Sequence, residues 1–188
     1  MQSARFDIQG PVLFTSPVHG DDRGTFFEAY HAQEIRDLLG FDPGFVQDNV
    51  SHSKPAGTLR GLHLQRPPFA QGKFVRCITG SIRDVIVDVR DGSATFGQSL
   101  HVDLCAEDGR ALWVPAGFLH GFVTQEANTI VTYKVTAHYD KNSDISVLWN
   151  DPDLDVDWGE IGGAPHLSEK DKNGLSFPAY QALIEDKS

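Results

Sequence analysis

The sequence predicts an all-β protein, a double-sheet jelly roll or small barrel with a few short flanking helices. Many short runs of β-branched and aromatic residues recur at regular spacing, with turn residues between them and little helical periodicity. One run alternates cleanly, with Val85, Val87 and Val89 on one face and Asp84 and Asp88 on the other. The 188 residues contain no internal repeat, low-complexity segment or convincing linker, so we expect one domain over residues 1–188.

The N-terminal part is expected to contain short strands and one helix. Strands are predicted at 6–14, 25–30 and 45–50, with a turn at 19–24. Residues 31–39 have helical spacing, and Gly40 suits the position just after a helix.

The central stretch, Thr58 to Gly80, is interpreted as two strands joined by a turn at Pro67 and Pro68. Alternation predicts two faces of the first strand: Leu59, Gly61, His63 and Gln65 on one, and Arg60, Leu62 and Leu64 on the other. The chain returns from Lys73 to Ile78. A hairpin would bring His63 and Lys73 to the same sheet face. A proton-accepting histidine beside a lysine is half of a site that enolises a ketone.

The remaining strands are expected at 81–90, 98–104, 111–114, 120–124, 129–137 and 144–149. Residues 150–163 are rich in aspartate and glycine and are expected to be irregular. Short helices are predicted at 168–172 and 178–186.

The composition argues against several kinds of partner. A formal net charge of -10 disfavours nonspecific binding to nucleic acid or to an anionic membrane. No apolar run approaches the ~20 residues of a membrane span, and the N-terminus does not resemble a signal peptide. Cys77 and Cys105 are expected to be free thiols. We expect a cytoplasmic protein that binds neither nucleic acid nor membrane.

Several segments, in chain order, carry a resemblance to a known family. They are 22–28 (DRGTFFE), 45–49 (FVQDN), 59–63 (LRGLH), 70–73 (AQGK), 93–97 (SATFG), 112–122 (LWVPAGFLHGF), 133–136 (YKVT) and 148–152 (LWNDP). The chain resembles the dTDP-4-dehydrorhamnose 3,5-epimerases, cupin-fold enzymes of deoxysugar nucleotide synthesis. The resemblance implies a double-stranded β-helix. The chain departs from the family at Leu64, where Phe is usual, and at Asp144, where Glu is usual.

A cupin scaffold raises the question of a metal. Gly57 and His63 match the start of the cupin metal motif, but Gln65 stands where a second histidine belongs. His120 matches the histidine in the second half of the motif. Two histidines without a carboxylate make a poor metal site, and Lys73 would repel a dication. We expect no metal and no cofactor.

The resemblance implies inversion at the carbons that flank a ketone, through an enolate. His63 is the candidate base, because imidazole titrates near neutral pH. Tyr133 is the candidate acid on the opposite side, and Lys73 would stabilise the enolate oxygen. Without the resemblance, a structural histidine, a surface lysine and a rim tyrosine are the more ordinary interpretations.

The residue that orients His63 has two candidates. Asp171 is the family match, but Ser168 and Asp171 also fit a helix-capping box. Asp84, one strand beyond Lys73, is the competing candidate.

Further polar and aromatic residues resemble the substrate-binding set of the family. They are Arg23, Phe26, Glu28, Gln47, Asn49, Arg60, His120, Tyr139, Asp144 and Lys170. Guanidinium groups suit the paired oxygens of a diphosphate, so Arg23 and Arg60 are the candidates for that contact. Tyr139 would stack on the base.

The leading hypothesis is a cofactor-independent epimerase that inverts C3 and C5 of dTDP-4-dehydro-6-deoxy-D-glucose. The alternative within the fold is a 3- or 5-epimerase of a related dTDP-4-keto-deoxysugar. A metal-dependent cupin oxygenase and a non-catalytic sugar-nucleotide binding protein are the other classes considered. The resemblance also implies a homodimer, in which Arg23 and Glu28 would act in the partner's pocket.

Overall fold

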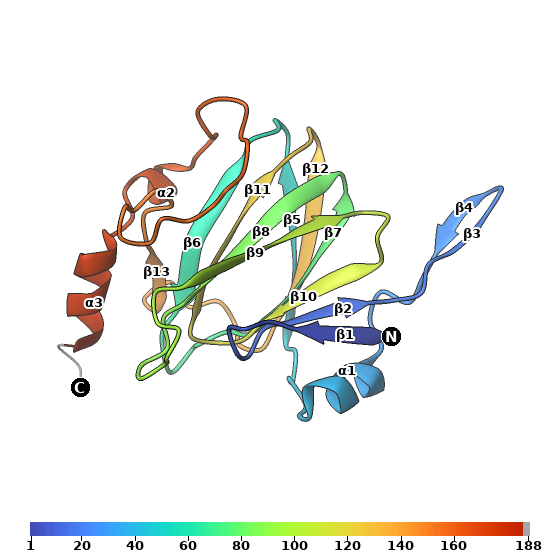
Figure 1. The fold of residues 1–188 in the computed structure, drawn as a ribbon, viewed down its shortest axis with the longest axis horizontal. Helices are drawn as coiled ribbons and strands as arrows, with labels where there is room; N and C mark the ends of the chain where they lie inside the picture. Colours follow the sequence, from blue (N-terminus) through green and yellow to red (C-terminus); the bar gives the residue numbers. More distant parts are fainter. Residues whose placement is uncertain (186–188) are drawn as a thin grey trace.

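The strands of the computed structural model, which describes residues 1–185, form two sheets that pack face to face (Figure 1). The larger sheet has the order β1 (Gln2–Arg5), β2 (Val12–Thr15), β10 (Arg110–Val114), β7 (Lys73–Thr79), β12 (Thr129–Val135) and β5 (Gln47–Ser53). The smaller sheet has the order β13 (Asp144–Ser146), β6 (Leu59–Gln65), β11 (Phe118–Thr124), β8 (Ser81–Asp88) and β9 (Ser99–Cys105). This arrangement confirms the predicted all-β, double-sheet class.

A third, two-stranded sheet projects away from this body. Its strands β3 (His19–Asp21) and β4 (Gly24–Phe26) form a hairpin that we call the arm (Figure 1). The predicted strand at 25–30 is therefore too long. The predicted strand at 6–14 is also misplaced, because β1 ends at Arg5 and β2 begins at Val12.

The three helices lie outside the sheets, at α1 (Ala32–Leu39), α2 (Glu169–Lys172) and α3 (Phe177–Glu185) (Figure 1). Helix α1 confirms the prediction for 31–39: the His31 side chain caps its start, and Gly40 adopts a φ of 84° after its end. Residue 186 of the helix predicted at 178–186 lies outside the described residues.

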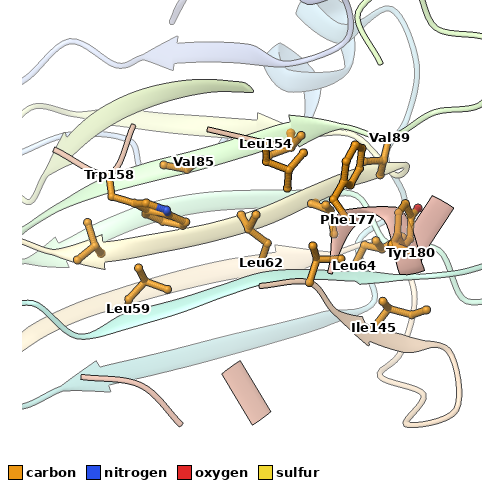
Figure 2. Packing of buried hydrophobic residues seen from close by; sticks show 14 residues of the cluster. Leu59, Leu62, Leu64, Val85, Val89, Ile145, Leu154, Trp158, Phe177 and Tyr180 are labelled. Carbon is orange, nitrogen blue, oxygen red and sulfur yellow. The ribbon is translucent and has the colours of Figure 1, made fainter. Parts of the chain in front are cut away.

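The alternation of β8 is confirmed and explains how both of its faces are buried. Ile82 and Ile86 point into the core between the sheets. Val85 and Val87 point outward, where a cluster that includes Leu154 covers the smaller sheet (Figure 2). The C-terminal residues of this cluster are Leu154, Trp158, Phe177 and Tyr180, so the chain after β13 forms a third layer over the smaller sheet.

The central stretch does not form the predicted hairpin. Strand β6 pairs with β11 and β13 in the smaller sheet, whereas β7 pairs with β10 and β12 in the larger one. The segment at 66–72, which contains Pro67 and Pro68, crosses from one sheet to the other. His63 and Lys73 consequently lie in facing sheets rather than on one face of a single sheet.

A β-bulge corrects the predicted alternation of β6. His120 of β11 lies opposite His63, but Phe122 lies opposite Arg60, so β6 carries one extra residue in this interval. Leu59 therefore joins Leu62 and Leu64 in the outer apolar cluster (Figure 2). Arg60 turns instead toward the same cavity as His63.

Glycine is required at the bulge. Gly61 has a φ of 143°, and a Cβ there would lie 2.5 Å from the Cα of Gly121 on the neighbouring strand. The close backbone approach at this point is what allows β6 to gain a residue without leaving the sheet.

The described residues also show the state of the two cysteines and the character of the helices. Cys77 and Cys105 are free thiols, as expected. Over residues 1–185 there is no helix with the length and apolar character needed to cross a membrane.

Candidate active site

A cavity of about 700 Å³ is lined by strands of both sheets and by the segment that contains α2. Its volume lies within the usual range for pockets that hold small molecules. All four predicted catalytic residues line it: His63, Lys73, Tyr133 and Asp171. The predicted substrate-binding residues that also line it are Gln47, Asn49, Arg60, His120, Tyr139, Asp144 and Lys170.

His63 and Asp171 form a hydrogen-bonded dyad. Nε2 of His63 lies 2.5 Å from Oδ1 of Asp171, whose side chain is almost fully buried. With the carboxylate ionised, Nε2–H donates to it, and Nδ1 remains as the ring nitrogen that can accept a proton. Burial raises the pKa of Asp171, but hydrogen bonds from His63 and Ser168 outweigh it and leave the pKa below its ordinary value.

Asp171 takes part both in the cap of α2 and in a hydrogen bond to His63. Ser168 is the N-cap of α2, and its Oγ accepts a hydrogen bond from the Asp171 backbone N–H at 3.1 Å. The same residue presents its carboxylate to His63.

Asp84 is a partner of a different histidine. Its Oδ1 lies 2.8 Å from Nε2 of His120, and both side chains are buried. Nδ1 of His120 lies 3.4 Å from Nζ of Lys73. The three groups form a chain in which Lys73 donates to His120 and His120 donates to Asp84. Asp84 is therefore linked through His120 to Lys73, whereas Asp171 is hydrogen-bonded to the candidate base, His63.

Burial alters the protonation of this chain. It lowers the pKa of Lys73 to about 8, although Asp84 and Asp144 act in the opposite direction. Burial also lowers the pKa of His120, partly offset by Asp84. At neutral pH Lys73 is still mainly cationic and His120 is neutral, which suits the hydrogen-bond directions described above.

Tyr133 lies on β12 of the larger sheet, opposite the sheet that carries His63. Burial raises the pKa of its phenol, so the hydroxyl remains protonated at neutral pH. The candidate base and the candidate acid therefore reach the cavity from facing walls, with Lys73 on the same sheet as the acid.

Asp144 organises one side of the cavity. Its Oδ2 accepts hydrogen bonds from the Tyr139 hydroxyl at 3.1 Å and from Lys170 Nζ at 2.5 Å. Tyr139 is 59% exposed, which leaves it accessible to an incoming planar group. Asp144 thus ties a strand of the smaller sheet to the segment that carries Asp171.

Polar contacts also hold the other predicted binding residues. Gln47 donates to Asn49 at 2.8 Å through their side-chain amides. Arg60 donates to the Ser53 hydroxyl at 3.2 Å and to the His52 carbonyl at 3.1 Å.

Arg23, Phe26 and Glu28 do not line the cavity of this chain. Arg23 pairs with Asp21 at the tip of the arm, and its side chain is 89% exposed. Phe26 is 72% exposed, which is unusual for so large an apolar side chain. Arg23 and Phe26 belong to the arm, which extends away from the body of the chain (Figure 1), whereas Glu28 lies after the arm, close to His31 and Glu34.

Sequence reasoning missed several residues that line the cavity. Gln65 is not among the predicted site residues, yet its amide donates to the carbonyls of Phe69 and His138 and accepts from the Asp140 backbone. Gln71 lies in one of the family segments and donates to the Ala137 carbonyl at 2.6 Å. The alternation of β6 was the available signal for Gln65. The other missed residues that line the cavity are Val50, Ser51, His52, Leu64, Phe122 and Ser168.

The donor set does not fit the metal site of a cupin. His63 and His120 are register partners, but each directs Nε2 at its own carboxylate, and the Lys73 amine approaches the remaining nitrogen of His120. Among residues 1–185, the cluster of three possible ligands is Glu28, His31 and Glu34, away from this cavity.

The fold and the cavity define a cupin-type protein whose cavity brings together several titratable side chains. The family model described as dTDP-4-dehydrorhamnose 3,5-epimerase matches residues 5–178. The chain belongs to the dTDP-4-dehydrorhamnose 3,5-epimerase family.

Individual relatives agree with this assignment. An enzyme of this name from Pseudomonas aeruginosa is 46% identical over 178 residues, which cover 94% of this chain and 96% of the relative. A Legionella pneumophila epimerase solved with dTDP-4-keto-L-rhamnose has a TM-score of 0.91 and 38% identity, covering 97% and 96% of the two chains. A 3'-monoepimerase from Streptomyces bikiniensis, solved with dTDP-quinovose, has a TM-score of 0.87 and 31% identity, covering 97% and 96%.

Proposed function

We propose that this protein converts dTDP-4-dehydro-6-deoxy-D-glucose to dTDP-4-dehydro-L-rhamnose by inverting C3 and C5. The observation that carries the proposal is the placement of His63 and Tyr133 on facing walls of one cavity, with Lys73 beside them. Inversion requires a proton to leave one face of a carbon and to return on the other face, which facing groups can accomplish.

The reaction begins with removal of a proton next to the C4 ketone. Nδ1 of His63 accepts the proton, while Asp171 stabilises the imidazolium through its hydrogen bond to Nε2. The electron pair moves to the C4 oxygen and forms an enolate. The Lys73 ammonium stabilises the enolate as charge develops on the oxygen.

Return of the proton completes the inversion. The Tyr133 phenol donates its proton to the carbon from the opposite face, and the enolate collapses to the ketone. The same sequence at the second carbon gives the product. The proton bound by His63 and the one lost by Tyr133 exchange with solvent, so no net oxidation or reduction takes place.

Solvent deuterium tests the proposal. With dTDP-4-keto-6-deoxyglucose in D₂O, wild-type protein should incorporate deuterium at C3 and C5. His63→Ala should abolish this exchange. Tyr133→Phe should reduce inversion more strongly than proton removal. Unchanged exchange in His63→Ala would overturn the assignment of the base.

The number of inverted centres is an outcome of the same experiment. The relative from Streptomyces bikiniensis is a 3'-monoepimerase, so this fold also accommodates single-centre chemistry. Exchange at one carbon alone would assign this chain to a 3- or 5-epimerase of a related dTDP-4-keto-deoxysugar. Binding of dTDP with no exchange at either carbon would indicate a non-catalytic binding protein.

We further propose a homodimer in which the arm of each chain completes the partner's cavity. Three observations support this: the arm extends from the body, Phe26 on it is exposed, and Arg23 and Glu28 lie apart from the cavity of their own chain (Figure 1). An arginine from the partner would supply a guanidinium for the diphosphate. The free cysteines support a cytoplasmic location for this assembly.

A further inference from the structure

We infer that Ser168 is a positioning residue whose hydroxyl fixes the rotation of the Asp171 carboxylate, so that Oδ1 points at His63. The inference rests on the proposed function, in which His63 is the base. It assigns to Ser168 a role in proton transfer that goes beyond capping α2.

The Ser168 hydroxyl is bonded twice to the same residue. Its Oγ donates to Oδ2 of Asp171 at 2.7 Å and accepts from the Asp171 backbone N–H at 3.1 Å. A hydroxyl has one proton to donate, and here it is used on the carboxylate. The two bonds hold both the backbone and the carboxylate end of Asp171, which restricts rotation of the group between them.

The carboxylate has few other restraints. Among residues 1–185, its side-chain hydrogen-bond partners are His63 on Oδ1 and Ser168 on Oδ2. The Asp171 side chain is only 4% exposed, so water has little access to replace a lost donor. Without the hydroxyl, Oδ2 would lose its partner and the bond to His63 would hold the carboxylate alone.

Backbone contacts hold the surrounding segment independently of Ser168. Before α2, His166 donates to the Gly57 carbonyl at 2.9 Å, and the His166 carbonyl accepts from Leu59 at 3.0 Å. After α2, Leu175 donates to the Ser146 carbonyl, and its carbonyl accepts from Leu148, both at 2.8 Å. Loss of one hydroxyl should therefore leave the segment in place and free only the carboxylate.

Three substitutions separate positioning from capping. Ser168→Ala removes the hydroxyl and leaves a poor N-cap, whereas Ser168→Gly removes the hydroxyl but leaves an acceptable N-cap. Ser168→Thr retains both functions. If the hydroxyl positions Asp171, kcat for solvent deuterium exchange should fall about tenfold in both Ala and Gly variants, with KM within about twofold of wild type. Ser168→Thr should restore kcat.

The results that would overturn the inference are distinct. If kcat is near wild type in Ser168→Gly and falls only in Ser168→Ala, the rate depends on how well residue 168 caps the helix. Ser168 would then act only as the N-cap of α2. Wild-type kcat in both variants would remove it from the reaction altogether.

A measurement that needs no turnover tests the role of Ser168 even if the proposed function is wrong. NMR of protein with ¹⁵N-labelled histidine reports the Nε2–H of His63 hydrogen-bonded to Asp171 without any turnover. This signal should shift or broaden in Ser168→Ala and Ser168→Gly and remain in Ser168→Thr. A changed signal with no activity in wild type would contradict the proposed function but retain the positioning role, and an unchanged signal would contradict the positioning role.

Discussion

Oδ1 of Asp171 lies 2.5 Å from Nε2 of His63, although 108 residues separate the two in sequence. The pairing depends on the third layer of the fold, because α2 is held against the smaller sheet by contacts before and after it. The chain after β13 therefore contributes to the candidate active site as well as covering the apolar face of that sheet.

Asp171→Asn should lower kcat by about 100-fold or more. The amide cannot stabilise an imidazolium as a carboxylate does, and it can impose the wrong ring tautomer on His63. KM should change little, because Asp171 supports the base and is not the predicted contact for the nucleotide. Solvent deuterium exchange measures the effect. Asp91→Asn, at an exposed turn, is the matched control. Equal rates in the two variants would contradict the dyad.

The pKa of Lys73 near 8 predicts a basic limit to activity. In the proposed reaction the ammonium form of Lys73 is the active one, so kcat/KM should fall as pH rises through about 8. Lys73→Arg should shift this limit to higher pH because guanidinium stays protonated, although its different shape should lower the maximum rate. A pH–rate profile of wild type with an unchanged plateau to pH 10 would contradict the role of Lys73.

The same lowered pKa predicts that the charge of Lys73 decreases the free energy of unfolding. A lysine that binds its proton more weakly in the folded state than in the unfolded state destabilises the fold at neutral pH. This cost is fully present below pH 8 and diminishes as pH rises from about 8 towards 10.5. Lys73→Met should therefore abolish exchange but raise the melting temperature at pH 7, by roughly 5 °C for about 2 kcal/mol. A lower melting temperature would contradict this prediction.

Local pattern was sufficient for most of the strands, and the family resemblance was needed to select the site residues. The valines and aspartates of β8 were assigned to their correct faces, because alternation follows directly from strand geometry. Helix α1 followed from its spacing and from Gly40. The resemblance grouped His63, Lys73, Tyr133 and Asp171, and all four line one cavity.

The local sequence pattern could not predict which distant strands pair, or where the backbone departs from regular strand geometry. A proline-containing turn between two strands is typical of a hairpin, yet the segment at 66–72 crosses between sheets. The bulge at Gly61 reverses the faces of Leu59 and Arg60, since one extra residue inverts an alternation of period two. Asp84 and Asp171 could not be distinguished as partners of His63, because only the folded structure shows the hydrogen bond between Asp84 and His120.

Gly61→Ala should destabilise the protein by about 3 kcal/mol or more. The added Cβ would meet the backbone of Gly121 at 2.5 Å, and a φ of 143° is itself unfavourable for alanine. Chemical denaturation measures the loss. Gly92→Ala is the control, because Gly92 also has a positive φ, 67°, but no atom within 4 Å of the added Cβ. Equal losses in the two variants would indicate backbone strain alone and would contradict the close approach at the bulge.

Mixed dimers test the proposed exchange of arms. Arg23→Ala and His63→Ala should each lower activity, since one removes a charge from the arm and the other removes the base from the cavity. When the two variants are unfolded together and refolded, half of the dimers should be mixed. In each mixed dimer, the cavity that retains His63 receives the intact Arg23 of the partner. Activity should recover to about one quarter of wild type.

The control is a mixture of His63→Ala with Lys73→Ala. Both residues line the cavity of their own chain, so every cavity in a mixed dimer keeps one defect and activity should not recover. Recovery in the first mixture alone would place Arg23 in the partner's site. No recovery in either mixture, with mixed dimers verified by mass spectrometry, would mean that the arm serves its own chain or serves only assembly.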